Sequence, residues 1–284
     1  MTEKYNFNEL VVTQFPRLGR GWSGGGTVAN GNFIEAGGKE TVIAVRDLHT
    51  GQLIGEPIKT DIPTSIHDIS YDPFTGTLWV SPGGGLQSYW NITMEGKKIR
   101  AIRRPEHGFG IFCDREDRDV MWGADQQGKR LVCVETATGD LFVRHVPLSF
   151  APRGVAKVGS YFWTTLAGEL NDPKGGHLYR VDSSGNILND FPLPRSKYAH
   201  DAGGLTVDSE GYLWMVGGKK LPIYRLDIKK VTGESIPQPV IPPITPEEPE
   251  DPITPDPDNT IQGVLSRLAD LEAWKKEMER KFNL

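Results

Sequence analysis

Several side chains that can do chemistry recur at broadly similar intervals along the first two hundred residues. They are Trp22, His67, Asp68, His107, Arg153, His200 and Asp201. Imidazole and carboxylate groups can hold a metal ion or move a proton, a guanidinium can bind an anion, and an indole can stack on a sugar. These residues can act together only if the strands and turns that carry them bring them to one place.

A short pattern around tryptophan repeats along the chain. The tryptophans are Trp79, Trp122, Trp163 and Trp214, and Ile34 takes the equivalent place in a fifth copy. Successive copies are 45, 43, 41 and 51 residues apart, and the last interval is long because Gly168–Gly176 is an expected inserted loop. A repeat of this length with four short strands in each unit is typical of a β-propeller.

The ends of the repeat region predict how the ring closes. The fifth repeat lacks an evident fourth strand, and an isolated strand, Glu9–Pro16, precedes the first repeat. We expect this strand to complete blade five, which would pair two edges that otherwise stay open. The fold class is therefore predicted to be all-β, with residues 1–236 forming a five-bladed propeller.

In a propeller, the candidate residues fall at the starts of the innermost strands, beside the mouth of the central channel. Three histidines, two aspartates and an arginine around one axis can bind a metal, an anion or a sugar. The alternative is a hydrogen-bonded network that fills the channel. The repeated tryptophans are expected to pack between blades, whereas Trp22 and Trp90 break the pattern and are candidates for exposed contacts.

Other site classes have no support in the sequence. There is no Ser-His-Asp order and no Cys/His zinc spacing, and the Gly24–Gly26 and Gly83–Gly85 runs lack the context of a phosphate-binding loop. Cys113 and Cys133 fall on the first and third strands of one blade, about 10 Å apart, which predicts two free buried thiols. No catalytic residue, metal or cofactor is assigned on this basis.

Charge is unevenly distributed along the 284 residues. Residues 1–236 carry 27 acidic and 27 basic side chains, so nothing indicates nucleic-acid binding. No apolar run reaches the roughly 18 residues of a membrane span, and membrane insertion is not expected. The first residues lack the features of a signal peptide, which predicts synthesis in a cytoplasm without export by that route.

The C-terminal part predicts a stalk and an oligomerisation helix. Residues 237–257 hold nine prolines with acidic residues between them, and 237–258 is expected to be an extended linker. Residues 259–284 predict a coiled-coil helix, in which Arg267–Glu272 matches a trimerisation pattern. The expected contact residues are Ile261, Val264, Arg267, Leu268, Leu271, Glu272, Met278 and Phe282. A homotrimer is favoured over a dimer and over docking on another protein.

The repeat resembles NHL, streptogramin-lyase and gluconolactonase-like propellers, best in His67–Trp79 and Asp201–Trp214. Lactonase-like members bind a divalent metal on the channel axis through carboxylates and an asparagine. Streptogramin lyases use histidines near the axis, a role that the resemblance implies for His67, His107 and His200.

The layout as a whole resembles a bacteriophage fibre or head-decoration protein. The expected function is a non-enzymatic appendage on the virion surface, made in the host cytoplasm. A capsid or tail protein would hold the C-terminal region, and the heads would contact a host glycan or receptor, where several weak sites gain avidity. The alternatives are a metal-dependent lyase or lactonase and a cytoplasmic scaffold.

Overall fold

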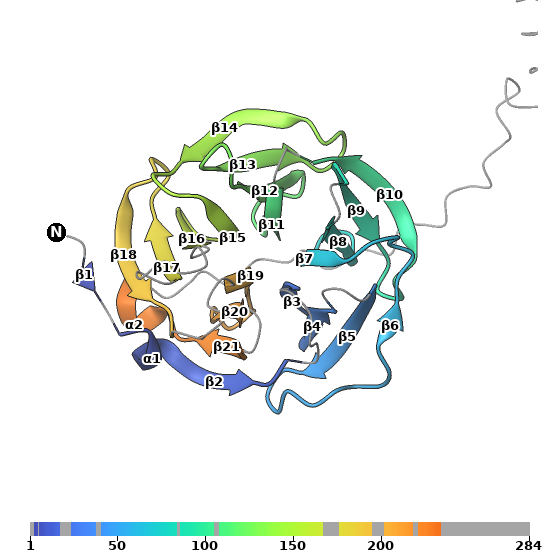
Figure 1. Cartoon of the computed structure of the whole chain (residues 1–284), viewed down its shortest axis with the longest axis horizontal. Helices are drawn as coiled ribbons and strands as arrows, with labels where there is room; N and C mark the ends of the chain where they lie inside the picture. The colour runs from blue at the N-terminus through green and yellow to red at the C-terminus, as the bar shows by residue number, and fades with distance from the viewer. Residues whose placement is uncertain are drawn as a thin grey trace, which may run out of the picture. The chain divides into compact units, whose positions relative to one another are not determined.

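Five blades surround a central channel in the computed structural model (Figure 1), as the repeat predicts. The structure describes residues 3–4, 6–17, 24–37, 41–83, 86–104, 108–166, 176–194, 202–217 and 221–233. Each blade is an antiparallel sheet whose strands follow one another from the channel outward, so the first strand of each blade lies innermost.

The strands of the blades have the following bounds. Blade 1 consists of β3 (Gly26–Ala29), β4 (Asn32–Ala36), β5 (Val42–Asp47) and β6 (Ile58–Lys59). Blade 2 consists of β7 (Ile66–Asp72), β8 (Thr77–Pro82), β9 (Ser88–Ile92) and β10 (Lys98–Arg103). Blade 3 consists of β11 (Gly108–Cys113), β12 (Val120–Asp125), β13 (Arg130–Glu135) and β14 (Leu141–Pro147).

The remaining two blades include the N-terminal residues. Blade 4 consists of β15 (Pro152–Val158), β16 (Tyr161–Leu166), β17 (His177–Val181) and β18 (Ile187–Pro192), and the short β1 (Glu3–Lys4) adds a parallel outer strand. Blade 5 consists of β19 (Ala202–Val207), β20 (Leu213–Gly217), β21 (Ile223–Leu226) and β2 (Val11–Phe15).

The N-terminal strand closes the ring, which confirms that prediction. β2 pairs antiparallel with β21, from Val11 opposite Leu226 to Phe15 opposite Ile223. The strand is shorter than predicted, because a helical turn, α1 (Phe7–Leu10), precedes it and Asn6 caps this turn by accepting the Asn8 amide. A second short helix, α2 (Lys229–Thr232), follows β21.

Apolar clusters lie between neighbouring blades. The tryptophans Trp79, Trp122, Trp163 and Trp214 are at most 2% exposed, which confirms that they pack inside the fold. Trp214 of blade 5 lies 5.1 Å from Phe33 of blade 1 between ring centroids. Trp90 is only partly buried, but it packs against the cluster between blades 1 and 2, and Lys98 Nζ lies 3.8 Å from its ring. It is therefore not the exposed contact that was predicted.

The hairpins within the blades use a recurring turn. In the turn between β7 and β8, Asp72 accepts the backbone amide of Phe74, and Gly76 has φ of +69°. An aspartate that accepts amides two or three residues on, followed by a glycine in the left-handed region, is a stable local arrangement. The same arrangement recurs in the turns that begin at Asp47, Asp182 and Asp208.

Both cysteines are free and buried, as predicted. Cys113 lies in β11 and Cys133 in β13 of the same blade. Burial raises the pKa of each thiol, so neither has the lowered pKa of a reactive cysteine.

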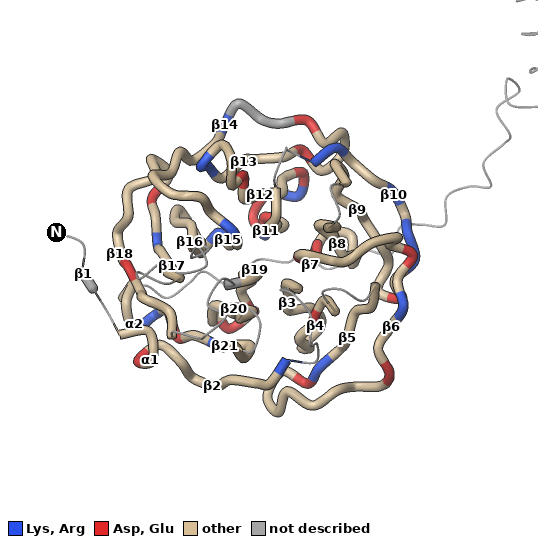
Figure 2. The backbone as a smooth tube through the Cα atoms, in the orientation of Figure 1, with Lys and Arg blue, Asp and Glu red and all other residues tan. Residues whose placement is uncertain are grey.

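Charged residues of both signs are interspersed around the propeller (Figure 2). No helix in the described part of the chain is long and apolar enough to cross a membrane. The linker 237–258, the helix 259–284 and most of the inserted loop lie outside the described residues.

Candidate active site

The innermost strands share a register that makes their residues comparable. In blade 2, Ser70 pairs with Trp79. The equivalent pairs of the other blades are Phe112 with Trp122, Ala156 with Trp163, Thr206 with Trp214 and Thr27 with Ile34. Two residues before the first member of each pair stand Asp68, Gly110, Gly154, Gly204 and Gly25. Four blades therefore carry glycine at this level of the channel, and blade 2 carries an aspartate.

The glycines are required by the narrowness of the channel. A Cβ on Gly25 would lie 1.6 Å from Oδ1 of Asp68, and a Cβ on Gly204 would lie 1.9 Å from the same atom. A Cβ on Gly110 would lie 2.3 Å from the carbonyl oxygen of Arg153. The side chain of Asp68 thus occupies the channel axis. It fits there because the neighbouring blades have glycine at this level.

Within the part of the chain that the structure describes, Asp68 is held by two backbone amides. Its Oδ1 accepts the amide of Ile69 and its Oδ2 accepts the amide of Ile111 in blade 3, both at 2.9 Å. The residue is 1% exposed, and this burial raises its pKa to about 8 although the two amides act in the opposite direction. At neutral pH the carboxyl group mostly keeps its proton and can donate it.

His67 and Phe109 form one wall of the space beside Asp68. Their rings stack with centroids 5.3 Å apart and planes inclined by 11°. The pKa of His67 is lowered by burial and, to a smaller extent, by the charges of Arg153 and Arg104. The imidazole is therefore neutral at neutral pH and can accept a proton.

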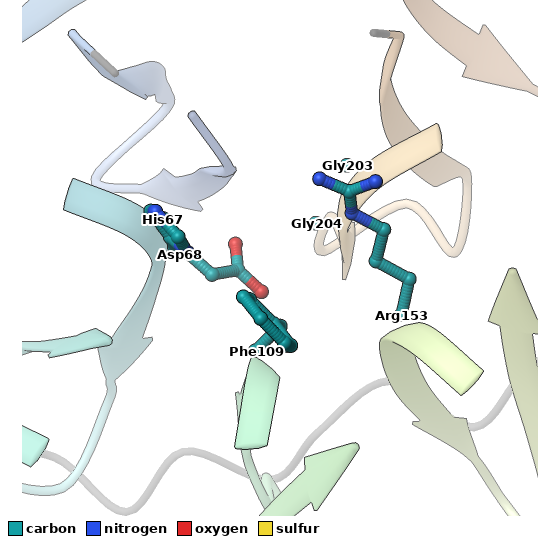
Figure 3. A pocket seen from close by; sticks show the side chains of 7 residues that line it. His67, Asp68, Phe109, Arg153, Gly203 and Gly204 are labelled. Carbon is teal, nitrogen blue, oxygen red and sulfur yellow. The ribbon is translucent and has the colours of Figure 1, made fainter. Parts of the chain in front are cut away.

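A small pocket joins these groups at the mouth of the channel. Its lining residues are His67, Asp68, Phe109, Gly110, Arg153, Gly203 and Gly204. Figure 3 shows the carboxyl group of Asp68 and the guanidinium of Arg153 reaching into the same space from different blades. A neutral acid, a neutral base and a fixed cation around one pocket are suited to proton transfer on an anionic molecule.

The pocket suits a metal ion poorly. Within the described residues, no group of three or more His, Cys, Asp or Glu side chains is arranged to hold one. Both oxygens of Asp68 already accept amides, and the nearby arginines oppose a further positive charge. The divalent metal that the lactonase resemblance implies does not fit the described part of this site.

The structure brings together three of the predicted site residues, His67, Asp68 and Arg153. The others, Trp22, His107, His200 and Asp201, lie outside the described residues. Phe109 and the glycines were not predicted from the sequence. An alignment of the five repeats on their inner strands would have found the glycines, because four repeats have glycine at this position and the remaining repeat has Asp68.

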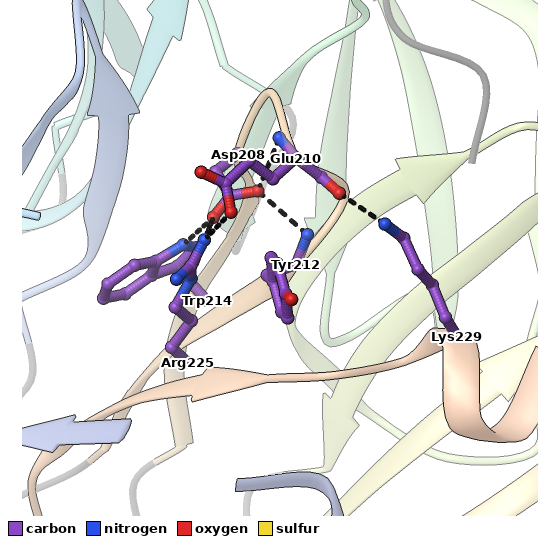
Figure 4. A network of polar contacts seen from close by, with 6 residues as sticks. All are labelled: Asp208, Glu210, Tyr212, Trp214, Arg225 and Lys229. Atoms are coloured by element: carbon purple, nitrogen blue, oxygen red, sulfur yellow. Dashed lines mark hydrogen bonds and ion pairs between the residues drawn. The ribbon is translucent and has the colours of Figure 1, made fainter. Parts of the chain in front are cut away.

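The opposite ends of the inner strands carry structural networks instead. Asp208 accepts the indole Nε1–H of Trp214 at 2.9 Å, Nε and Nη2 of Arg225, and the amides of Glu210 and Tyr212 (Figure 4). Asp114 accepts Nε1–H of Trp122 in the same way. In blades 3 and 5 the aspartate and the tryptophan of the repeat therefore hold each other in place, which accounts for the pair there without a ligand.

The arrangement as a whole defines a β-propeller with a pocket on its channel axis that is lined by His67, Asp68 and Arg153. Solved structures are similar to it. The glutaminyl cyclase of Myxococcus xanthus has a TM-score of 0.58 at 13% identity, over 76% of this chain and 94% of that chain. A streptogramin B lyase has a TM-score of 0.45 at 14% identity, over 75% and 96%. A catalytically inactive virginiamycin B lyase from Staphylococcus aureus, with quinupristin, has 0.43 at 17% identity, over 74% and 65%. The sequence matches no family model and no curated protein.

One of these neighbours corrects a prediction. The chain was expected not to be an enzyme, yet a solved structure that shares its propeller fold is a glutaminyl cyclase. That expectation is wrong, because it took the propeller for a non-catalytic head. At these identities the likeness is one of fold alone, and the chemistry depends on the residues of this chain.

Proposed function

We propose that this protein is an enzyme that binds a small anionic substrate at the channel mouth and converts it by general acid–base catalysis. One observation supports this most strongly: a carboxyl group with a pKa of about 8 lines the same pocket as a neutral imidazole and a guanidinium. Pairs of titratable groups whose surroundings push their pKa values to opposite sides of neutrality are typical of acid–base sites.

Each residue takes a role that follows from its protonation state. His67 removes a proton from the substrate, and Asp68 gives its own proton to the leaving group. Arg153 binds the anionic part and stabilises negative charge that develops during the reaction. One proton leaves the substrate and one arrives, and exchange with solvent restores both side chains. Eliminations and intramolecular acyl transfers have this proton balance.

The pocket limits the substrate to a small group. Phe109 and His67 offer a flat wall, and Gly110, Gly203 and Gly204 present only backbone beside the side chains of Asp68 and Arg153. The substrate class proposed is therefore a small carboxylate, or the carboxylate-bearing end of a larger molecule, with an amide, ester or lactone as the reacting bond.

The test is a turnover assay of the full chain with small carboxylate-bearing amides, esters and lactones, including a glutaminyl peptide. We expect His67→Ala and Asp68→Gly to lower kcat/KM by about 10²–10⁴-fold, the usual contribution of a general acid or base. The kcat/KM profile should be bell-shaped, rising at acidic pH as His67 loses its proton and falling near pH 8 as Asp68 does.

His49→Ala is the matched control, because this histidine is exposed in a turn far along blade 1 from the pocket. Its kcat/KM should equal that of the wild type. A substrate that is turned over equally well by the His67→Ala and Asp68→Gly variants would place the chemistry elsewhere.

We also propose that three copies of the chain assemble through residues 259–284 and display their propellers on a virion surface. The support is the sequence alone: the proline-rich linker 237–258 and the Arg267–Glu272 pattern. In this proposal the C-terminal region attaches to a capsid or tail protein, and the pocket acts on a molecule of the host surface, such as a glycan with acidic groups.

Light scattering of the purified chain tests the assembly. The full chain should have three times the mass of one chain, and Leu268→Asp with Leu271→Asp should reduce it to a monomer, because both positions belong to the expected apolar seam. Lys276→Asp, which lies off the seam, should remain trimeric. A wild-type chain that stays monomeric at high concentration would exclude the trimer.

A further inference from the structure

A buried arginine next to the pocket has no negative partner among the described residues. Arg104 follows β10 and is 8% exposed. It donates one hydrogen bond, from Nη1 to the carbonyl oxygen of Pro82 at 2.6 Å, and its Nε–H has no partner. Within the described residues no carboxylate forms an ion pair with it. An unpaired buried charge is costly, so native proteins normally provide a counter-ion.

Two more unpartnered donors lie beside Arg104, both 0% exposed. They are the hydroxyl groups of Ser81 in β8 and Tyr89 in β9. Val80 pairs with Trp90, so the next pair along the two strands is Ser81 and Tyr89, on one face of blade 2. Tyr89 also pairs with Ile102 in β10, two residues before Arg104, which places Arg104 on the same face.

This face of blade 2 is covered by blade 3. Tyr89 and Ile102 pack with Ile111 and Met121 of blade 3. A Cβ on Gly123 of β12 would lie 2.8 Å from the Tyr89 hydroxyl, so the absence of a side chain at this position makes room for that group. Ser81, Tyr89 and Arg104 thus form an interblade cluster, closed off from solvent and made of donors.

We propose that the interblade cluster of Ser81, Tyr89 and Arg104 binds a small monovalent anion of the size of a halide ion. The guanidinium supplies the charge, and its Nε–H and the two hydroxyl groups supply hydrogen bonds. Bound water would satisfy the hydroxyl groups but would leave the guanidinium charge uncompensated. The close approach of Gly123 to Tyr89 favours a compact ion over an extended organic anion.

The interblade cluster adjoins the proposed catalytic pocket, because Ser81 pairs with Asp68 across β8 and β7 and the charge of Arg104 acts on His67. The proposed anion ligands, however, include neither His67 nor Asp68. The anion site can therefore be tested without a substrate, and failure of either proposal leaves the other standing.

Bromide is the probe, because it replaces chloride and scatters X-rays anomalously. In crystals of the full chain soaked in sodium bromide, we expect an anomalous peak within hydrogen-bond distance of Arg104 Nε and the Tyr89 hydroxyl. Arg104→Met crystals should lack this peak. An adventitious ion only, with peaks confined to exposed side chains, would overturn the proposal.

Thermal unfolding gives a second readout. At equal ionic strength, exchanging sodium gluconate for sodium chloride or bromide should raise the Tm of the wild type by several degrees, because an anion that binds the folded state stabilises it. The Tm of Arg104→Met should not respond. Arg103→Met is the matched control, since Arg103 is the exposed neighbour in β10 and its loss should leave the anion response intact.

Tyr89→Phe guards against a folding failure of Arg104→Met. It keeps the buried ring and removes only the hydroxyl group, so the variant should fold and show a weakened response to bromide. Equal responses in the wild type, Arg104→Met and Tyr89→Phe would overturn the proposal.

Discussion

Replacing Asp68 by glycine is expected to change how the stability of the protein depends on pH. Burial raises the pKa of Asp68 to about 8 in the folded protein, from 3.8 as the ordinary value. Between these two values the unfolded chain has released the proton and the folded protein still holds it. The free energy of unfolding of the wild type should therefore fall with rising pH, by up to about 1.4 kcal/mol per pH unit from this group.

The direction can be checked at both ends of the range. Below about pH 4 both states hold the proton, and above about pH 8 neither does, so the contribution of Asp68 is level there. Asp68→Gly lacks this group and has the residue that four other blades tolerate at the same level. The free energy of unfolding of the wild type minus that of the variant, measured with urea at pH 5 to 9, should decrease up to about pH 8 and then level off.

Asp68→Asn serves as a comparison that keeps the shape of the side chain. It also abolishes the pH dependence, but it turns an amide donor toward one of the two amides of Ile69 and Ile111. We expect an additional loss of about 1–3 kcal/mol, the usual cost of an unsatisfied buried donor. Parallel pH profiles for wild type and Asp68→Gly would mean that the carboxyl group is ionised throughout.

Asp208→Ala is expected to destabilise the propeller by about 3–5 kcal/mol, because it leaves the buried guanidinium of Arg225 without its main partner. Arg225 is 8% exposed, and two of its nitrogens donate to Asp208 Oδ2 at 3.0 and 3.1 Å. Glu210 also contacts Arg225, at 2.6 Å, but this glutamate is more than half exposed and compensates poorly.

Asp182→Ala is the control that separates the turn from the ion pair. Asp182 accepts the amides of Ser184 and Asn186 as Asp208 accepts those of its own turn, but it has no tryptophan or arginine partner among the described residues. Its loss should cost about 1 kcal/mol. Equal destabilisation by the two substitutions, in matched thermal or urea unfolding, would show that the Arg225 interaction contributes little.

Much of the fold was predictable because the repeated residues are large and apolar and must be buried. A tryptophan or isoleucine after each turn marks the second strand of every blade, and proline marks the end of most fourth strands. The turn α1 was not predicted, because Phe7 and Leu10 are three residues apart and belong to a helical turn that is too short to show a period.

The site was predictable in position but not in chemistry. The propeller repeat alone places His67, Asp68 and Arg153 near one axis. Whether Asp68 keeps its proton depends on its burial among the glycines of other blades. The sequence around Asp68 does not indicate this burial. Arg104 was missed because an Arg-Arg pair in a basic strand usually lies in solvent, and here register turns the second arginine inward.

The strand order of blade 5 has a mechanical consequence. The last strand of the ring, β21, lies between β20 and the N-terminal β2 rather than at the edge of its sheet. Tension that enters from the C-terminal end of the chain is therefore shared by two ladders of hydrogen bonds. We therefore expect β21 to resist a force applied at that end better than an edge strand would, because β2 holds it on its outer side.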